Sequence, residues 1–271
     1  MKIYGIDFTS SPKRKPIACV ECSLVGRKLH FRSRYEWNSF EGFERALTQP
    51  GPWIAGIDFP FGQSRIFAEN IGWPNEWQNY VRHVKGLGRD GFRCALNAYR
   101  APRKSGDKEH RRATDKLAKS ISPQKLYGTP VALMFFEGAP RLLEAGVTIP
   151  GLQQGDPNRI VVEAYPGVLA RSLICRRSYK QDTKKKQTDE QHQARKDLLR
   201  KILEEGIRQD YGLSVDAPNS LTDDPTGDQL DALLCCIQAA WAWTQRDRNF
   251  GAPSQIDPIE GWIADPNANR Y

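Results

Sequence analysis

The chain has 271 residues, of which 27% are charged and 39% hydrophobic, with 22 Gly and 18 Pro spread along its length. This composition excludes collagen, coiled coils and intrinsic disorder, and it is typical of a globular protein with a substantial core. The longest apolar run, around 232–243, contains Gln238 and is too short to span a bilayer. Asp7 interrupts the apolar stretch that a secretory signal would need, so we expect a cytoplasmic protein without membrane association.

The net charge of +8 is unevenly distributed along the chain. Residues 82–125 contain 13 Lys or Arg against 4 Asp or Glu, and residues 171–201 contain 11 against 4. Because these segments contribute +9 and +7, the remainder has a net charge of −8. An acidic body with two basic segments favours a polyanionic partner such as nucleic acid. Solvated helix faces give similar runs of charge and remain an alternative.

The first sixty residues predict a compact order of strands and one helix. Residues 2–8, 16–25 and 28–36 are rich in β-branched and aromatic residues, and turn signals separate them, so we predict three consecutive strands. A helix is predicted after a cap at Asn38 or Ser39, with a stop at Pro50 and Gly51. The apolar segment 53–61 is typical of a strand covered on both faces. The predicted order is β-β-β-α-β.

The character of the chain changes between residues 66 and 150, where aromatic and basic residues are mixed. We interpret 66–150 as a basic, mostly helical insertion, either part of the same domain or a small lobe. The strand pattern returns before Glu163, a basic helix is predicted over about 189–210, and a last strong helix follows Gly227. The predicted core therefore consists of residues 1–65 and 151–271.

The last helix places two aspartates on one flank. At about 100° per residue, its apolar residues form a single stripe, made of Leu230, Leu233, Leu234, Ile237 and Trp241. Asp228 and Asp231 lie beside this stripe, about 60° apart, so both can face one site. Asp228 could instead serve only as a cap at the start of the helix.

Three further carboxylates follow apolar strands, namely Asp7, Asp58 and Glu163. In an open α/β sheet, the carboxyl edge of the strands is where ligands bind. Several acids gathered there would raise one another's pKa unless a cation lies between them. Carboxylate oxygens suit Mg²⁺ or Mn²⁺, and two such ions about 4 Å apart can activate water for phosphodiester hydrolysis. The sequence therefore predicts a divalent-metal site at this edge.

Several motifs along nearly the whole chain look familiar. The element order and the late D-x-x-D-A helix resemble the ribonuclease H-like superfamily, closest to its Holliday-junction-resolvase-like branch. The chain more specifically resembles the domain-of-unknown-function 429 family, predicted ribonuclease H-like nucleases, in GIDFTSSP, GIDFPFG, VEAYPG, GDQLDALLCCIQAAWAW and GWI. The resemblance implies a mixed five-stranded sheet flanked by helices, with the helical insertion added. It also implies catalytic metal ligands at Asp7, Asp58, Asp228 and Asp231, assisted by Glu163.

The insertion supplies candidates for binding the substrate. The run KEHRRATD places Lys108, His110, Arg111 and Arg112 close together, where cationic side chains can bind phosphate. Aromatic residues among basic ones also suit unpaired bases. The alternative is a helical cap whose aromatic residues form their own small core.

The sequence favours a divalent-metal-dependent nuclease acting on DNA or RNA. A second interpretation is phosphoryl transfer by an actin-like kinase, but Phe8 and Thr9 follow Asp7 where those kinases have a glycine, and no Gly-rich phosphate loop follows. A third is a non-catalytic nucleic-acid-binding protein whose acids are structural. Paired cutting of a junction would need a homodimer, but no exposed apolar stripe indicates one.

Overall fold

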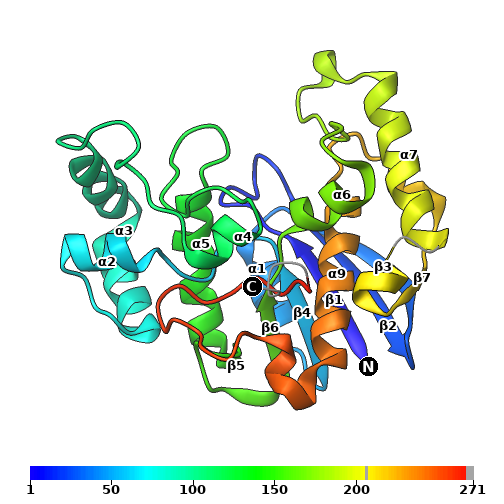
Figure 1. Ribbon diagram of the computed structural model, residues 1–271, viewed down its shortest axis with the longest axis horizontal. Helices are drawn as coiled ribbons and strands as arrows, with labels where there is room; N and C mark the ends of the chain where they lie inside the picture. Colours follow the sequence, from blue (N-terminus) through cyan, green and yellow to red (C-terminus); the bar gives the residue numbers. More distant parts are fainter. Residues whose placement is uncertain (205–206, 267–271) are drawn as a thin grey trace.

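The computed structural model describes residues 1–204 and 207–266 and contains a seven-stranded mixed sheet between layers of helices (Figure 1). The strand order is β5-β6-β4-β1-β2-β3-β7. The strands are β1 (Lys2–Asp7), β2 (Ile17–Val25), β3 (Lys28–Trp37), β4 (Trp53–Ile57), β5 (Val147–Thr148), β6 (Asp156–Glu163) and β7 (Ser214–Asp216). β2 pairs antiparallel with β1 and β3, and the other neighbours are parallel.

The helices of the described residues fall into two groups around this sheet. The first comprises α1 (Phe40–Leu47), α2 (Arg65–Ile71), α3 (Trp77–Arg100), α4 (Ala113–Leu117) and α5 (Val131–Ala145). The second comprises α6 (Pro166–Ile174), α7 (Asp189–Glu204), α8 (Arg208–Tyr211) and α9 (Asp228–Thr244). Short 3-10 turns, η1 (Lys184–Lys186), η2 (Asn219–Thr222) and η3 (Arg246–Gly251), complete the elements.

The predicted order β-β-β-α-β is confirmed, and so are the strand before Glu163 and the last helix. The prediction of five strands is wrong, because β5 and β7 extend the sheet by two- and three-residue edge strands. Such short segments have too few residues to produce an alternating pattern in the sequence. The basic helix predicted over 189–210 ends at Glu204, residues 205–206 lie outside the described ones, and α8 follows.

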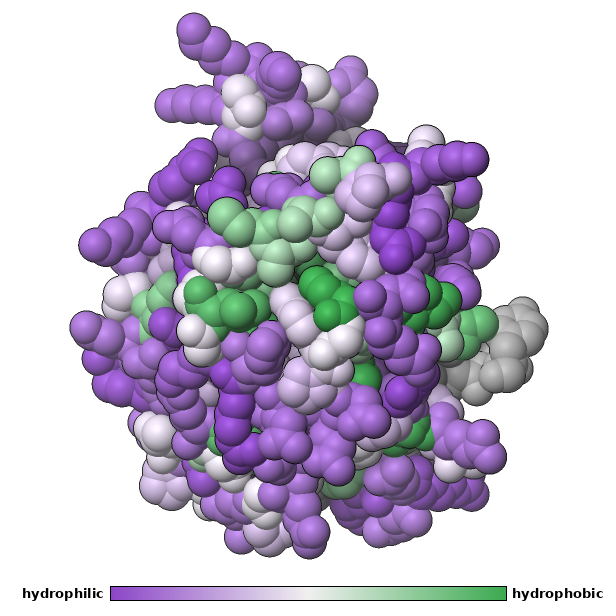
Figure 2. All heavy atoms as spheres, turned by 90° about the vertical axis from the view of Figure 1, so that its left-hand side faces the viewer, coloured by the Kyte–Doolittle hydropathy of each residue, from purple (hydrophilic) through white to green (hydrophobic). Residues whose placement is uncertain are grey.

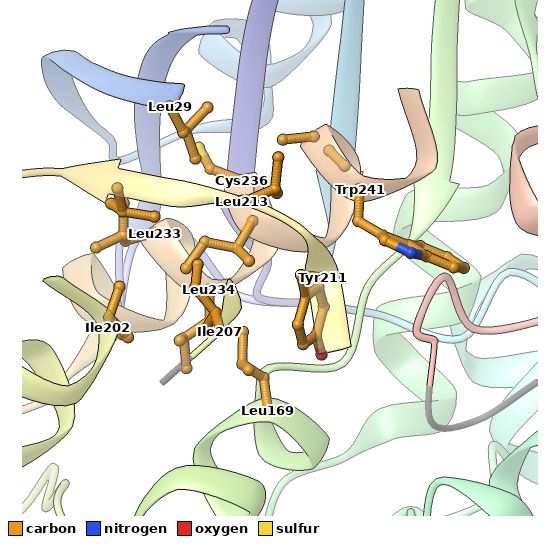
Figure 3. Packing of buried hydrophobic residues seen from close by; sticks show 14 of the residues in the cluster. Leu29, Leu169, Ile202, Ile207, Tyr211, Leu213, Leu233, Leu234, Cys236 and Trp241 are labelled. Carbon is orange, nitrogen blue, oxygen red and sulfur yellow. The ribbon is translucent and has the colours of Figure 1, made fainter. Parts of the chain in front are cut away.

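Alternation along the strands divides the core into one cluster on each face of the sheet. Ile3, Ile54 and Val162 belong to the cluster that packs against α6, α7 and α9. Figure 3 shows that cluster around Leu233 and Leu234 of α9. The predicted apolar stripe of α9 is buried throughout, and β4 is buried at every residue because helices cover both of its faces.

The opposite face of the sheet packs against the insertion. Ile6, Ala55 and Val161 share one cluster with residues of α2, α3 and α5. Phe59, at the end of β4, contacts the rings of both Phe8 and Phe61. Residues 66–150 thus pack on the same core as the strands. The outer surface on this side is mostly hydrophilic, with a band of hydrophobic residues across its middle (Figure 2).

Among residues 1–204 and 207–266, no helix combines the length and apolar character needed to cross a bilayer.

Candidate functional site

Two glycines allow α9 to approach the centre of the sheet. Gly5 of β1 and Gly56 of β4 are register partners in the parallel pair. A Cβ atom on Gly5 would lie 1.9 Å from the carbonyl oxygen of Ala232, and one on Gly56 would lie 2.4 Å from that of Cys235. The backbone of α9 therefore rests directly on the two strands, and the first turn of the helix reaches the carboxyl ends of both strands.

Alternation directs the strand-end aspartates toward α9. Asp7 lies two residues after Gly5, and Asp58 lies two residues after Gly56, so each continues the face that meets the helix. The backbone N–H of Asp58 donates to the carbonyl of Ile6, which extends the pairing of β4 with β1 to the strand end. Both aspartates are half-buried. They meet Asp228 and Asp231 from the first turn of α9, both of which are buried.

The start of α9 leaves these two helix aspartates available to the site. Asp224 provides the local cap, since its carboxylate accepts from the Thr226 hydroxyl at 2.6 Å and from the Gln229 backbone N–H at 3.3 Å. Gly227, at the N-cap, has a φ of 76°, in the left-handed region that glycine adopts without strain. Asp228 is the first helical residue, so the alternative that it serves only as a cap is not what the structure shows.

Two lysines from outside the sheet form ion pairs with two of the four aspartates. The Lys15 Nζ lies 2.8 Å from Asp228 Oδ1 and 3.0 Å from Asp182 Oδ1. Lys180 forms an ion pair with Asp231, and the Tyr179 hydroxyl donates to Asp231 Oδ1 at 2.5 Å. Asp228 and Asp231 are thus each held by a cation that reaches them from a loop.

The surroundings raise the pKa of the carboxyls that face one another. Burial, followed by the charges of Asp228 and Asp231, raises the pKa of Asp7 well above its usual range. Burial raises the pKa of Asp58 to about 7, although Lys180 acts in the opposite direction. Burial also raises the pKa of Asp228, although the ammonium group of Lys15 acts in the opposite direction. The site contains more negative charge than its two lysines balance.

The chemistry of the donors fits a hard divalent cation, because carboxylate oxygens from four side chains lie in the same part of the fold. In the described part of the chain, however, no three His, Cys, Asp or Glu side chains already surround a common point as ligands. The ammonium groups of Lys15 and Lys180 pair with the carboxylates there, at Asp228 and Asp231. They stand in for a cation, and an ion could be held by Asp7, Asp58, Asp228 and Asp231 once the ammonium groups withdraw.

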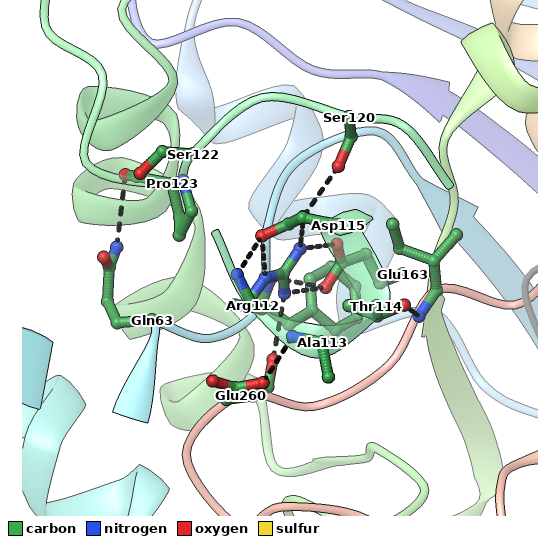
Figure 4. A network of polar contacts seen from close by, with 12 residues as sticks. Gln63, Arg112, Ala113, Thr114, Asp115, Ser120, Ser122, Pro123, Glu163 and Glu260 are labelled. Carbon is green, nitrogen blue, oxygen red and sulfur yellow. Dashed lines mark hydrogen bonds and ion pairs between the residues drawn. The ribbon is translucent and has the colours of Figure 1, made fainter. Parts of the chain in front are cut away.

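Glu163 does not join the four aspartates. It follows Val161, whose side chain faces the insertion, so alternation points the glutamate to the opposite face from α9. Its two oxygens accept from Arg112 at 2.5 and 2.7 Å, and one also accepts from the Phe61 backbone N–H at 2.8 Å. Both charged side chains are buried (Figure 4). Glu163 is fully engaged there, so the expectation that it assists a metal is not supported by its position.

The other partners of Arg112 complete this buried network. Its Nη2 donates to Asp115 Oδ1 at 2.8 Å, and its Nη1 donates to the Glu260 carbonyl at 2.9 Å. Ala113 N–H donates to the Glu260 carboxylate at 2.8 Å. The network connects α4 of the insertion to β6 and to the C-terminal segment. Arg112 is 1% exposed, and so the structure does not present it to a phosphate as we expected.

The remaining predicted substrate-binding residues are dispersed. Lys108 and Arg111 are exposed. His110 is half-buried, its Nε2 lies 2.7 Å from the Tyr99 hydroxyl, and burial lowers its pKa. No interaction of the described residues links these three side chains to the aspartates of the site.

Sequence reasoning missed Lys15, Tyr179 and Lys180 as members of the site. Lys15 lies in a loop with other cations and Lys180 in the second basic segment, so both looked like solvated charge. A signal for Glu163 did exist, because strand periodicity places it on the opposite face to Asp7 and Asp58.

The fold and the site define a mixed α/β protein whose central parallel strands end on a group of aspartates. The chain matches the family described as "Protein of unknown function (DUF429)" over residues 5–255, and it therefore belongs to that family. This confirms the family resemblance read from the sequence motifs. No curated protein and no solved structure matched the chain.

Proposed function

We propose that this protein is a divalent-metal-dependent nuclease that hydrolyses phosphodiester bonds in DNA or RNA on a ribonuclease H-like core. The observation that supports the proposal most is the convergence of Asp7, Asp58, Asp228 and Asp231. Four carboxylates placed at the ends of two adjacent parallel strands and at a helix start are costly to a fold. They are understandable if the site holds cations.

In this proposal, Asp7 and Asp58 hold the ions from the strand ends, and Asp228 and Asp231 hold them from α9. When bound, Mg²⁺ or Mn²⁺ would neutralise the scissile phosphate and lower the pKa of a water molecule. Lys15 and Lys180 then leave their carboxylates, and their ammonium groups become available to phosphate oxygens. Arg112 and Glu163 hold the insertion against the sheet and do not contact the substrate.

A non-catalytic nucleic-acid-binding protein is the second candidate. The ion pairs of Lys15 with Asp228 and of Lys180 with Asp231 favour it, because they satisfy two of the four acids without a metal. Such a protein would bind nucleic acid in a salt-sensitive way without metal-dependent turnover.

A cleavage screen distinguishes the two candidates. Single-stranded, duplex and junction DNA and RNA are incubated with Mn²⁺ or Mg²⁺ and the wild type, Asp7→Asn or Asp247→Asn. Asp247 lies beyond the far end of α9 and its side chain is 86% exposed, so this variant is a matched control. The proposal expects cleavage by the wild type and the control only. Absence of cleavage by the wild type on every substrate would favour the binding protein.

A further inference from the structure

A basic cavity lies beside the aspartate site. It has a volume of about 400 Å³ and is formed by α6, by the segment after α6 and by Lys119 after α4. Four cationic side chains line it, namely Lys119, Arg171, Arg176 and Arg177, and no acidic residue of the described chain does so. A concave surface with only positive side chains attracts an anion.

Among the described residues, two of these cations have no hydrogen-bond or ion-pair partner. Arg171 donates to the Ala118 carbonyl at 3.0 Å, and Arg177 pairs with Asp197 at 2.7 Å. Lys119 and Arg176 make no side-chain hydrogen bond or ion pair with any other residue among 1–204 and 207–266. Arg171 and Arg177 therefore form a fixed framework, and Lys119 and Arg176 add two cationic side chains that have no partner in the described part of the chain.

Two tyrosines connect the cavity to the aspartates. Tyr179 lines the cavity, and its hydroxyl donates to Asp231. Burial and the charge of Asp58 raise the pKa of Tyr165, while the charge of Arg171, which lines the cavity, lowers it. Tyr179 therefore contacts both the cavity and a carboxylate of the aspartate site.

The backbone around the cavity takes unusual conformations. Lys119 has a φ of 54°, and Cys175 has a φ of 58° and a ψ of −132°. Non-glycine residues rarely adopt these angles, and such residues concentrate at ligand sites. Gly167 is also required, because a Cβ there would lie 2.8 Å from the Tyr165 ring. Two non-glycine residues with positive φ that line the same cavity indicate that its shape is specifically maintained.

From this arrangement we infer that the cavity binds a backbone phosphate of a nucleic-acid chain, next to the phosphate that reaches the aspartates. Lys119 and Arg176 pair with the phosphate, while Arg171 and Arg177 shape the site. The inference rests on the proposed function for its choice of polymer. It replaces Arg112 as the expected phosphate contact, since Arg112 is buried with Glu163 and Asp115.

Binding without metal tests the inference independently of cleavage. A fluorescein-labelled single-stranded 20-mer is titrated in EDTA, over a range of salt concentrations, with the wild type and with Lys119→Ala/Arg176→Ala. The control is Arg27→Ala/Lys28→Ala, which removes the same charge from the exposed hairpin at the opposite end of β2. We expect the cavity variant to bind about tenfold more weakly and its log-log salt slope to fall by about 1, with the control unchanged.

Any other outcome of the binding titration overturns the inference. If the wild type does not bind the 20-mer, the cavity does not bind nucleic acid. The same conclusion follows if the cavity variant keeps the affinity and the salt slope of the wild type. If inorganic phosphate binds in the cavity but the cavity variant still binds the 20-mer as the wild type does, the cavity is a small-anion site instead. The cavity variant could bind the 20-mer weakly while none of the proteins in the cleavage screen cuts a substrate. This result would support the phosphate site and rule out only the proposed nuclease activity.

Discussion

Gly5 of β1 and Gly56 of β4 are register partners, and the backbone of α9 crosses both with no room for a side chain. This close approach places Asp228 and Asp231, one turn earlier in the helix, beside the aspartates that end the two strands. The two glycines therefore determine where the candidate site is assembled, although neither belongs to it.

Gly5→Ala should lower the free energy of unfolding by about 3 kcal/mol or more, because its Cβ must displace the Ala232 carbonyl. Urea denaturation measures the effect. The control is Gly86→Ala in α3, where nothing lies within 4 Å, and there the change should be small or stabilising by up to about 1 kcal/mol. Equal effects of the two substitutions would show that α9 does not rest on Gly5.

Arg112→Met should destabilise the protein by about 3–5 kcal/mol, because Glu163 and Asp115 would be left buried without their cation. Arg112→Lys should not restore stability, since one ammonium cannot replace the forked contacts to both acids. Thermal and urea unfolding provide the measurement. The neighbouring Arg111 is exposed, so Arg111→Met should change stability by no more than about 0.5 kcal/mol. If Arg112→Met leaves the stability of the protein nearly unchanged, the buried network is contradicted.

Lys180→Met should make the protein bind Mn²⁺ about tenfold more tightly, because the ion would no longer compete with an ammonium group for Asp231. Isothermal calorimetry on the wild type and the variant compares the dissociation constants directly. Lys184→Met removes an exposed charge from the same basic segment and should leave the constant unchanged. Weaker binding by the Lys180 variant would instead make that lysine part of the binding site.

Asp58 should give the metal-free protein a distinctive pH dependence. Its pKa is about 7 in the fold and near 4 in the unfolded chain, so the folded state binds the extra proton between these values. Stability linked to Asp58 is thus present below pH 4 and lost as the pH rises through 7. In EDTA, Asp58→Asn should therefore gain about 4 kcal/mol over wild type between pH 4 and pH 8, because each pKa unit of the shift corresponds to about 1.4 kcal/mol. A constant difference across this range would contradict the raised pKa.

Much of the fold was predictable because its signals are local. Stretches rich in β-branched and aromatic residues between turn signals located β1 to β3, and a continuous apolar run located β4. The stripe that includes Leu233 and Ile237 located α9. Strand ends also carry local signals, so Asp7 and Asp58 could be placed at one edge. The edge strands β5 and β7 are too short to produce a pattern, and the strand count was consequently wrong.

The partners of the site were not predictable, because they come from distant parts of the chain. Lys15 and Asp228 are separated by most of the sequence, and a lysine in a basic loop has no feature that indicates a buried carboxylate partner. The same holds for Arg112 and Glu163, which pair across the boundary of the insertion. The orientation of Glu163 was recoverable from strand alternation alone.

The most direct test is Mn²⁺ calorimetry on the wild type and Asp7→Asn, with and without a single-stranded oligonucleotide. Asn keeps the shape of the side chain and removes its charge, so folding should be preserved. We predict saturable binding by the wild type and at least a tenfold loss of affinity in the variant. If the wild type binds no Mn²⁺ even with the oligonucleotide present, the four aspartates are not a metal site, and Lys15 and Lys180 are their permanent partners.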